Sequence, residues 1–335
     1  MKNSKIKKQK TKILLCLFVG IFYCASCTIN TGTLPSAQGN VGEVLVIMRD
    51  YLWRGACGDS IRHYLTEPVM GLPAPEPMFA LRQQDELTAF MQKSRNVLIV
   101  NIDQGLETTT LKYRSDVYSK FQLIFNLDAP SADSAIACMY KNKDLIIGNF
   151  LMKGRDAIIE DYKKSVAQPI VDHLREKYQV DIVIPTSYKL GMEKEDFVWI
   201  AREEGERQWG ILMWKEPYIS IDQLNTDNLI AKMNAMTRAV TGNAAGSYMA
   251  EETLFPPVVK RFEKNGVYTV QMNGLWQMEN GFAGGPYVHQ TIVDIKHNQL
   301  VTAHGFVFYP MREKRQMVRQ LEAILHSMTP TAEEN

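Results

Sequence analysis

Two histidines near the C-terminal end of the chain come closest to a metal-ligand pattern. His289 and His304 flank His297-Asn298, a pair of residues that fits a two-residue hairpin turn. In that register Thr291 pairs with His304, so the two histidines lie on one face as diagonal neighbours, with Cβ atoms roughly 6 to 8 Å apart. A zinc site needs a third protein ligand, which the sequence does not place nearby. We therefore expect paired histidines that are at the surface or half-buried, and predict no metal or cofactor, with His289 and His304 as the candidates for such a site.

Familiar catalytic motifs do not occur in the sequence. It contains no Gly-x-Ser-x-Gly turn, no His-Glu-x-x-His motif and no setting of Cys, His and Asn for a thiol nucleophile. We therefore predict no catalytic residue.

A glycine-rich stretch and several aromatic residues are candidates for ligand binding. Gly284 and Gly285 lie in a stretch that could bring backbone N–H groups close to an anionic or sugar ligand. Tyr287 and Trp209 belong to a set of aromatic residues that could line a sugar or peptide groove. The simpler interpretations are a bulged turn for the glycines and core packing for the aromatic rings.

The first residues of the chain predict export and lipidation. Six lysines without an acidic residue precede the apolar run Ile13–Cys27, which is too short for a membrane-spanning helix. The run ends in Cys24-Ala25-Ser26-Cys27, which resembles the site at which bacterial lipoproteins are cut and lipidated. We predict that Cys27 is lipidated and becomes the membrane anchor, with an ordinary secretory signal or an uncleaved anchor as the alternatives.

The residues after Cys27 bear on location and partners. No acidic residue follows in Thr28–Gly32, which favours the outer membrane and its periplasmic face. Removing the six leader lysines from a chain of formal net charge +1 leaves it acidic by about five charges, which gives no basic surface for nucleic acid. Cys57 and Cys138 could pair in an oxidising compartment, although a small core residue is the simpler interpretation of Cys138.

Apolar patterning predicts an α+β fold with antiparallel sheets and helices on one face. Val44–Met48 is a continuous apolar run expected to be a strand buried on both faces. A unit of two strands and an amphipathic helix then recurs three times in pattern. The units are Val97–Ile102 and Phe121–Leu127 with a helix from Ser131; Phe197–Arg202 and Gln208–Trp214 with a helix over Asp222–Val240; and Thr291–Lys296 and Leu300–Tyr309 with a helix over Arg312–Met328.

Domain boundaries follow from these patterns. We predict a signal peptide over 1–27, a flexible tether over 28–40, an α+β domain over 41–178 and a second over 179–330, with the two domains in one continuous unit as the alternative. A long helical segment over Arg155–Tyr178 separates them, and Pro169 is expected to kink or divide it.

Three stretches resemble an uncharacterised Bacteroidetes lipoprotein family known as domain of unknown function 4837. They are Gly42-Glu43-Val44-Leu45-Val46, the hairpin over Phe197–Tyr218, and Gly284-Gly285-Pro286-Tyr287 with the hairpin and helix that follow. The resemblance covers nearly the whole mature chain. It implies an exported, lipid-anchored envelope protein and brings no catalytic residue, substrate or cofactor.

The function that the sequence favours is a lipid-anchored envelope protein that binds an envelope component, such as a glycan, or a protein partner. An envelope hydrolase with a site near His289 and His304 is one alternative, and a structural subunit of an envelope complex is another.

Overall fold

The apolar runs expected to be buried strands lie side by side in the smaller of two main sheets. The computed structural model describes residues 33–195 and 197–332, so the signal segment and the lipidation site at Cys27 lie outside the described residues. The smaller sheet has the order β2-β1-β3-β5-β4. Its strands are β1 (Glu43–Ile47), β2 (Ala80–Gln84), β3 (Asn96–Ile102), β4 (Thr110–Ser115) and β5 (Leu123–Ala129).

Pairing in this sheet differs from the antiparallel arrangement predicted for it. The β2-β1, β1-β3 and β3-β5 pairs are parallel, and only β4 pairs antiparallel with β5. Parallel strands need both faces covered, which explains the continuous apolar runs. The first of the three predicted units is therefore no hairpin, because its two strands, β3 and β5, pair in parallel.

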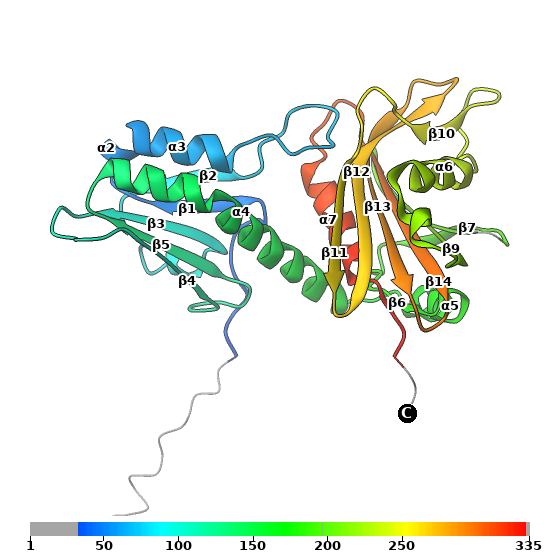
Figure 1. Ribbon diagram of the computed structural model, residues 1–335, viewed down its shortest axis with the longest axis horizontal. Helices are drawn as coiled ribbons and strands as arrows, with labels where there is room; N and C mark the ends of the chain where they lie inside the picture. The colour runs from blue at the N-terminus through cyan, green and yellow to red at the C-terminus, as the bar shows by residue number, and fades with distance from the viewer. Residues whose placement is uncertain (1–32, 196, 333–335) are drawn as a thin grey trace, which may run out of the picture. The chain divides into compact units, whose positions relative to one another are not determined.

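Three helices cover one face of the smaller sheet. They are α2 (Asp50–Trp53), α3 (Ala56–Leu65) and α4 (Ala132–Lys163), and α3 and α4 lie next to each other over the strands (Figure 1). Helix α4 begins directly after Ser131, close to the predicted start, and Ser131 caps it: its Oγ accepts a hydrogen bond from the N–H of Ser134 at 3.2 Å. The opposite face is packed by the short helix η1 (Met91–Lys93) and by loop residues such as Tyr118.

The long helical segment divides at Pro169, as predicted. Helix α4 ends at Lys163, and α5 (Gln168–Tyr178) begins with Pro169 in its first turn, where a missing N–H is tolerated. Helix α5 ends at Gln179, which is left-handed with φ of 56°. It leads into β6 (Val180–Asp181), which pairs with β15 (Thr329–Pro330).

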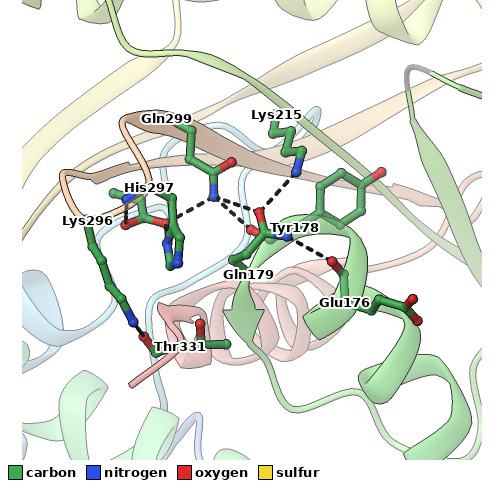
Figure 2. Close-up of polar contacts among 9 residues, drawn as sticks. Glu176, Tyr178, Gln179, Lys215, Lys296, His297, Gln299 and Thr331 are labelled. Carbon is green, nitrogen blue, oxygen red and sulfur yellow. Dashed lines mark hydrogen bonds and ion pairs between the residues drawn. The ribbon is translucent and has the colours of Figure 1, made fainter. Parts of the chain in front are cut away.

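A polar network fixes the end of α5 to the larger sheet. Gln299 donates from Nε2 to the carbonyl oxygen of Tyr178 and to the carboxylate of Asp294, both at 3.0 Å. Lys215 donates to the side-chain oxygen of Gln179, also at 3.0 Å (Figure 2). These contacts join the end of α5 to two neighbouring strands. The bond from Gln299 also gives a donor to the Tyr178 carbonyl, one of the carbonyl groups at a helix end that have no partner within the helix.

Eight strands of the described residues form the larger, antiparallel sheet. Its order is β10-β12-β13-β14-β9-β8-β7, and β11 also pairs with β12. The second and third predicted strand pairs are confirmed as the hairpins β8-β9 and β13-β14. The strands are β7 (Lys189–Glu193), β8 (Val198–Glu204), β9 (Arg207–Pro217), β10 (Tyr248–Glu251), β11 (Val258–Lys264), β12 (Val267–Glu279), β13 (Gly284–Asp294) and β14 (Gln299–Phe308).

Helices cover both faces of the larger sheet, which corrects the prediction of one covered face. Alternate residues of β9 show why: Ile211 and Met213 pack with α5 and α7 (Arg315–Ser327), while Leu212 and Trp214 pack on the other side. That other side is covered by η2 (Ile221–Leu224) and α6 (Thr226–Thr237), which lie across the sheet from α7 (Figure 1). The α+β class itself is as predicted.

The proline-rich segment Glu67–Met78 reaches the start of α7. The Glu76 side chain is buried, and its two oxygens accept the backbone N–H groups of Lys314 at 2.7 Å and Arg315 at 2.9 Å. A carboxylate therefore occupies the electropositive start of α7. The guanidinium of Arg315 also donates a hydrogen bond to the carbonyl oxygen of Pro77. Residues from Ser36 onward form one compact unit.

Candidate functional site

The two predicted histidines lie directly opposite each other in the larger sheet. His289 on β13 pairs with His304 on β14, and their ring centroids are 5.7 Å apart. The predicted diagonal arrangement is wrong because the turn is longer than two residues: Asp294 pairs with Gln299, and Asn298 takes a positive φ of 50°. The longer turn shifts the pairing of β13 with β14 by two residues from the predicted register. A shift of two residues keeps His289 and His304 on the same face of the sheet, as predicted.

Both histidines are core residues, which corrects the prediction of surface or half-buried side chains: helices cover both faces of the sheet at this point. Their side chains are 1% and 0% exposed, with the ring of Trp214 beside His289 and that of Tyr287 beside His304. Burial lowers the pKa of His289 to about 3 and holds that of His304 well below its usual value, so both rings are neutral at pH 7. His289 Nε2 lies 3.2 Å from the hydroxyl of Thr291.

The surroundings of the histidine pair do not suit a metal ion or a substrate. The described residues contain no group of three or more His, Cys, Asp and Glu side chains placed to hold a metal ion. The almost complete burial of both rings also separates them from solvent. The geometry therefore gives no support to a hydrolytic site at His289 and His304.

The predicted ligand-binding residues do not come together in one site. Tyr287 is fully buried on the α6 side of the larger sheet, where its hydroxyl donates to Glu251 at 2.9 Å. Trp209 is buried on the opposite side, under the guanidinium of Arg202 at 4.4 Å. The two aromatic rings thus belong to different core clusters and line no shared groove.

The glycine-rich stretch is part of a strand rather than a bulged turn. Gly284 and Gly285 open β13, and a Cβ on Gly285 would lie 2.1 Å from the carbonyl oxygen of Val307. Glycine is required there because the neighbouring backbone approaches closely. Gly284 is exposed and Gly285 is buried.

Neither of the two described cysteines forms a disulfide. Cys57 on α3 is buried and Cys138 on α4 is partly buried, and both are free thiols. Burial raises the pKa of the Cys57 thiol, which makes it a poor nucleophile at neutral pH.

A pocket that the sequence analysis did not predict lies between α4, α7 and the strands β11 and β12. We call it the α4–α7 pocket; its volume is about 380 Å³, within the range of small-molecule sites. Helix α4 lines it with Gly148, Leu151, Met152, Gly154, Arg155 and Ile158. The other walls are Val41, Lys260, Phe262, Gln271, Arg319, Glu322 and His326.

Positive charge exceeds negative charge on these walls. Three cations, Arg155, Lys260 and Arg319, line the α4–α7 pocket with one carboxylate, Glu322. One oxygen of Glu322 accepts a hydrogen bond from the side chain of Asn273 at 2.9 Å. Within the part of the chain that the structure describes, none of the three cations forms an ion pair.

The titration of nearby groups reflects this excess. Burial and then the positive charge of Arg155 lower the pKa of Lys264 to about 8. Burial, Arg155 and Lys264 together lower the pKa of His326 to about 3, so this ring is neutral at pH 7. Burial also lowers the pKa of Arg319 to about 10, which leaves its guanidinium charged.

Two local signals in the sequence point to this pocket in retrospect. Gly148 and Gly154 lie inside a helix, where glycine costs about 1 kcal/mol relative to alanine and needs a packing or functional reason. Arg319 sits among the apolar residues of α7 and is 8% exposed. Neither signal says which other elements complete the site.

Two family descriptions match successive parts of the chain. Residues 37–163 match domain of unknown function 8532, and residues 167–327 match domain of unknown function 4837. The predicted resemblance to family 4837 is thus confirmed for the second part. The stretch Gly42–Val46 falls in the match to family 8532, so the resemblance to family 4837 does not extend over the whole mature chain.

Two solved structures show weak similarity. The crystal structure of LpqN, involved in cell envelope biogenesis of Mycobacterium tuberculosis, has a TM-score of 0.29 and 12% identity, covering 46% of this chain and 83% of that chain. A crystal structure from Bacteroides thetaiotaomicron has a TM-score of 0.22 and 11% identity, covering 48% of this chain and 47% of that chain. The comparison with curated proteins gave no match. Among the described residues, every helix is too short or too polar to cross a bilayer.

Proposed function

We propose that this chain, whose residues 167–327 match the family domain of unknown function 4837, is a lipid-anchored envelope protein that binds a small envelope component in the α4–α7 pocket. Its family carries no known activity, so the proposal depends on the leader sequence for location and on the pocket for binding.

The leader supports the location. A basic segment, a short apolar run and the cysteine at position 27 follow one another in the order of a lipoprotein signal. Several acyl chains on Cys27 would hold the protein on the membrane, because each buried methylene contributes about 0.8 kcal/mol. The absence of an acidic residue directly after Cys27 favours the outer membrane and its periplasmic face.

The observation that carries the binding role is a buried cation without an ionic partner at a cavity wall. Arg319 is 8% exposed, and its Nη1 has no hydrogen-bond partner among the described residues. Burying a charge without a counter-charge lowers stability, so a ligand that supplies the partner explains why the arginine is there. A binding role is favoured over the hydrolase alternative because the pocket is open, whereas His289 and His304 are enclosed.

The location is tested by labelling cells with palmitate. We expect label on the wild-type protein in the outer-membrane fraction, and none on a Cys27→Ala variant. Label that persists on Cys27→Ala would place the acyl group elsewhere and contradict the assignment of Cys27.

The binding role is tested by native mass spectrometry of protein extracted from membranes. We expect the wild-type protein to carry a non-covalent small molecule that a Gly148→Leu variant lacks, because the exposed Gly148 lines the open side of the pocket and a leucine side chain there would obstruct it. Ala231→Leu on the exposed side of α6 is the matched control and should keep the bound molecule. A wild-type protein without any bound molecule, or one that Gly148→Leu also retains, would count against the pocket.

A further inference from the structure

We infer that the α4–α7 pocket takes an oxyanion, a carboxylate or a phosphate group, carried on an apolar chain, and that Arg155 and Arg319 bind the oxyanion. The inference rests on the proposed function, because it names the class of ligand for the same pocket. Three features of the walls carry it: uncompensated charge, unpartnered guanidinium nitrogens and an apolar surface beside them.

Uncompensated charge is the first feature. Arg155 on α4, Lys260 on β11 and Arg319 on α7 approach the cavity from three directions, against the single carboxylate of Glu322. Glu322 is itself held by Asn273, at 2.9 Å. Asp156, next to Arg155 on α4, is a second carboxylate that acts on Arg155, so the cations exceed the carboxylates by one. A ligand with one negative charge balances the walls, whereas a neutral or cationic ligand leaves them unbalanced.

Unpartnered nitrogens are the second feature. The Nε of Arg155 and the Nη1 of Arg319 are both buried and have no hydrogen-bond acceptor within the described parts of the chain. The Arg319 guanidinium also donates from Nη2 to the backbone carbonyl of Met78 and lies 5.2 Å from the ring of Phe79, and neither contact supplies a negative charge. Guanidinium groups bind carboxylate and phosphate oxygens through paired N–H donors, so an oxyanion satisfies both arginines at once.

An apolar surface next to the cations is the third feature. Val41, Leu151, Ile158 and Phe262 line the same cavity. Gly148, an exposed residue of α4, leaves space on that side of the pocket, because no atom outside its own stretch of helix lies within 4 Å of the position its Cβ would take. The open space suits an apolar chain, and a free inorganic ion would leave these walls uncovered.

Lys264 and His326 provide an independent reporter for the oxyanion. Lys264 donates to the backbone carbonyl of His326, and the His326 ring lies 6.1 Å from the ring of Phe262. Burial and then the positive charge of Arg155 lower the pKa of both side chains, and Asp156 opposes this at Lys264. A bound oxyanion opposes that charge, so it raises both pKa values.

The test measures how four probes bind to the full-length lipoprotein in an uncharged detergent. The probes are hexyl phosphate, hexanoate, 1-hexanol and inorganic phosphate, and the readout is the dissociation constant from calorimetry. We expect hexyl phosphate or hexanoate to bind about tenfold or more tightly than 1-hexanol, because charge-assisted hydrogen bonds to a guanidinium are the strong ones. Whichever of the two anions binds more tightly identifies the headgroup, and weak binding of inorganic phosphate confirms the contribution of the chain.

Variants assign the effect to the pocket. Arg155→Gln should weaken the anionic probes about tenfold and leave 1-hexanol unchanged, while Arg155→Lys should fall between. Arg114→Gln on the exposed face of β4 is the matched control and should change nothing. Hexyl phosphate should also raise the pKa of His326, followed by NMR, in wild type more than in Arg155→Gln.

Two outcomes overturn different claims. If 1-hexanol binds as tightly as the anionic probes, and Gly148→Leu abolishes the binding of both, the pocket binds ligand but the oxyanion assignment is wrong. If Gly148→Leu changes the binding of no probe, the pocket is not the site and the proposed function fails with it. If a variant loses more thermal stability than the Arg114→Gln control, the test is made by NMR in the wild-type protein alone, where hexyl phosphate should raise the pKa of His326 and 1-hexanol should not.

Discussion

The histidine pair of the larger sheet and the α4–α7 pocket both contain buried nitrogens without partners, yet they differ in charge. His304 has no partner at either ring nitrogen, but burial leaves the ring neutral. Arg319 lacks a partner at Nη1 and stays charged, because its pKa of about 10 is far above neutrality. A histidine escapes the cost of burial by losing its proton, and an arginine does not.

The difference shows which buried polar groups point to a ligand. An unpartnered neutral ring, 0% exposed, is compatible with ordinary core packing at modest cost. An unpartnered permanent charge beside a cavity of about 380 Å³ has both a reason to attract a ligand and the space to hold one. Four changes test this distinction, described from the largest expected effect to the smallest.

Placing a charge at the histidine pair should have the largest effect. We expect His304→Asp to lower the free energy of unfolding by at least about 3 kcal/mol, because the site has no counter-charge or cavity for a carboxylate. His304→Gln, which is neutral, should lower it by about 1 kcal/mol. Urea denaturation followed by tryptophan fluorescence measures both. An equal loss of unfolding free energy in the two variants would mean that the histidine pair tolerates a buried charge as the α4–α7 pocket does.

Acidification should destabilise the protein through His289. Its pKa is about 3 in the folded protein and about 6.5 in the unfolded chain, so between these values only the unfolded chain binds the proton. The contribution of His289 to the free energy of unfolding is therefore complete above pH 6.5. It falls as the pH drops, and at pH 5 the free energy of unfolding is lower by about 2 kcal/mol. The measurement is the free energy of unfolding of wild type and of His289→Gln at several pH values from 5 to 8. The difference between the two proteins removes the contributions of Glu251 and His326, which both proteins contain. A difference that stays constant with pH would show that His289 is not buried as neutral imidazole.

Removing a charge from the pocket should stabilise the protein. Arg155→Met replaces an unpaired, partly buried cation with an apolar side chain of similar length, and we expect a gain of about 1 kcal/mol in the free energy of unfolding. Urea denaturation without added ligand measures it. A clear loss of stability would mean that Arg155 serves the fold, and that the pocket resembles the histidine pair after all.

The smallest expected change is at Gly148. We expect Gly148→Ala to raise the free energy of unfolding by about 0.5 to 1 kcal/mol, because alanine favours the helix and its Cβ meets no other atom. Gly154→Ala is the matched control: its Cβ would lie 3.2 Å from Val41, so it should gain less or lose stability. Thermal melts compare the two variants. Equal changes would remove the argument that Gly148 keeps space for a ligand.

The sequence predicted those features that depend on residues close together in the chain. The start of α4 at Ser131 and the division of the long helical segment at Pro169 were both predicted, because the signals for helix starts and for proline act within one helical turn. The shared face of His289 and His304 also followed from strand periodicity. Their direct pairing did not, because the length of the turn between them sets the register.

The pocket lay beyond such reasoning for a physical reason. Its cations come from α4, β11 and α7, which meet only when the two sheets and their helices have packed. Arginine and lysine are ordinary surface residues, so none of the three cations stands out in the sequence. Only the burial of Arg319 and the lack of ion pairs distinguish these cations from other surface charges. Burial and pairing are properties of long-range contacts, which one sequence does not reveal.

The buried carboxylate of Glu76 limits how this protein can be divided. A fragment restricted to residues 167–327 would keep α7 but lose the side chain that accepts the N–H groups of Lys314 and Arg315. It would also lose the carbonyl oxygens of Pro77 and Met78, to which Arg315 and Arg319 donate. The boundary between the two family matches therefore separates two sequence descriptions, but a truncation there would leave a helix start and two arginines without acceptors.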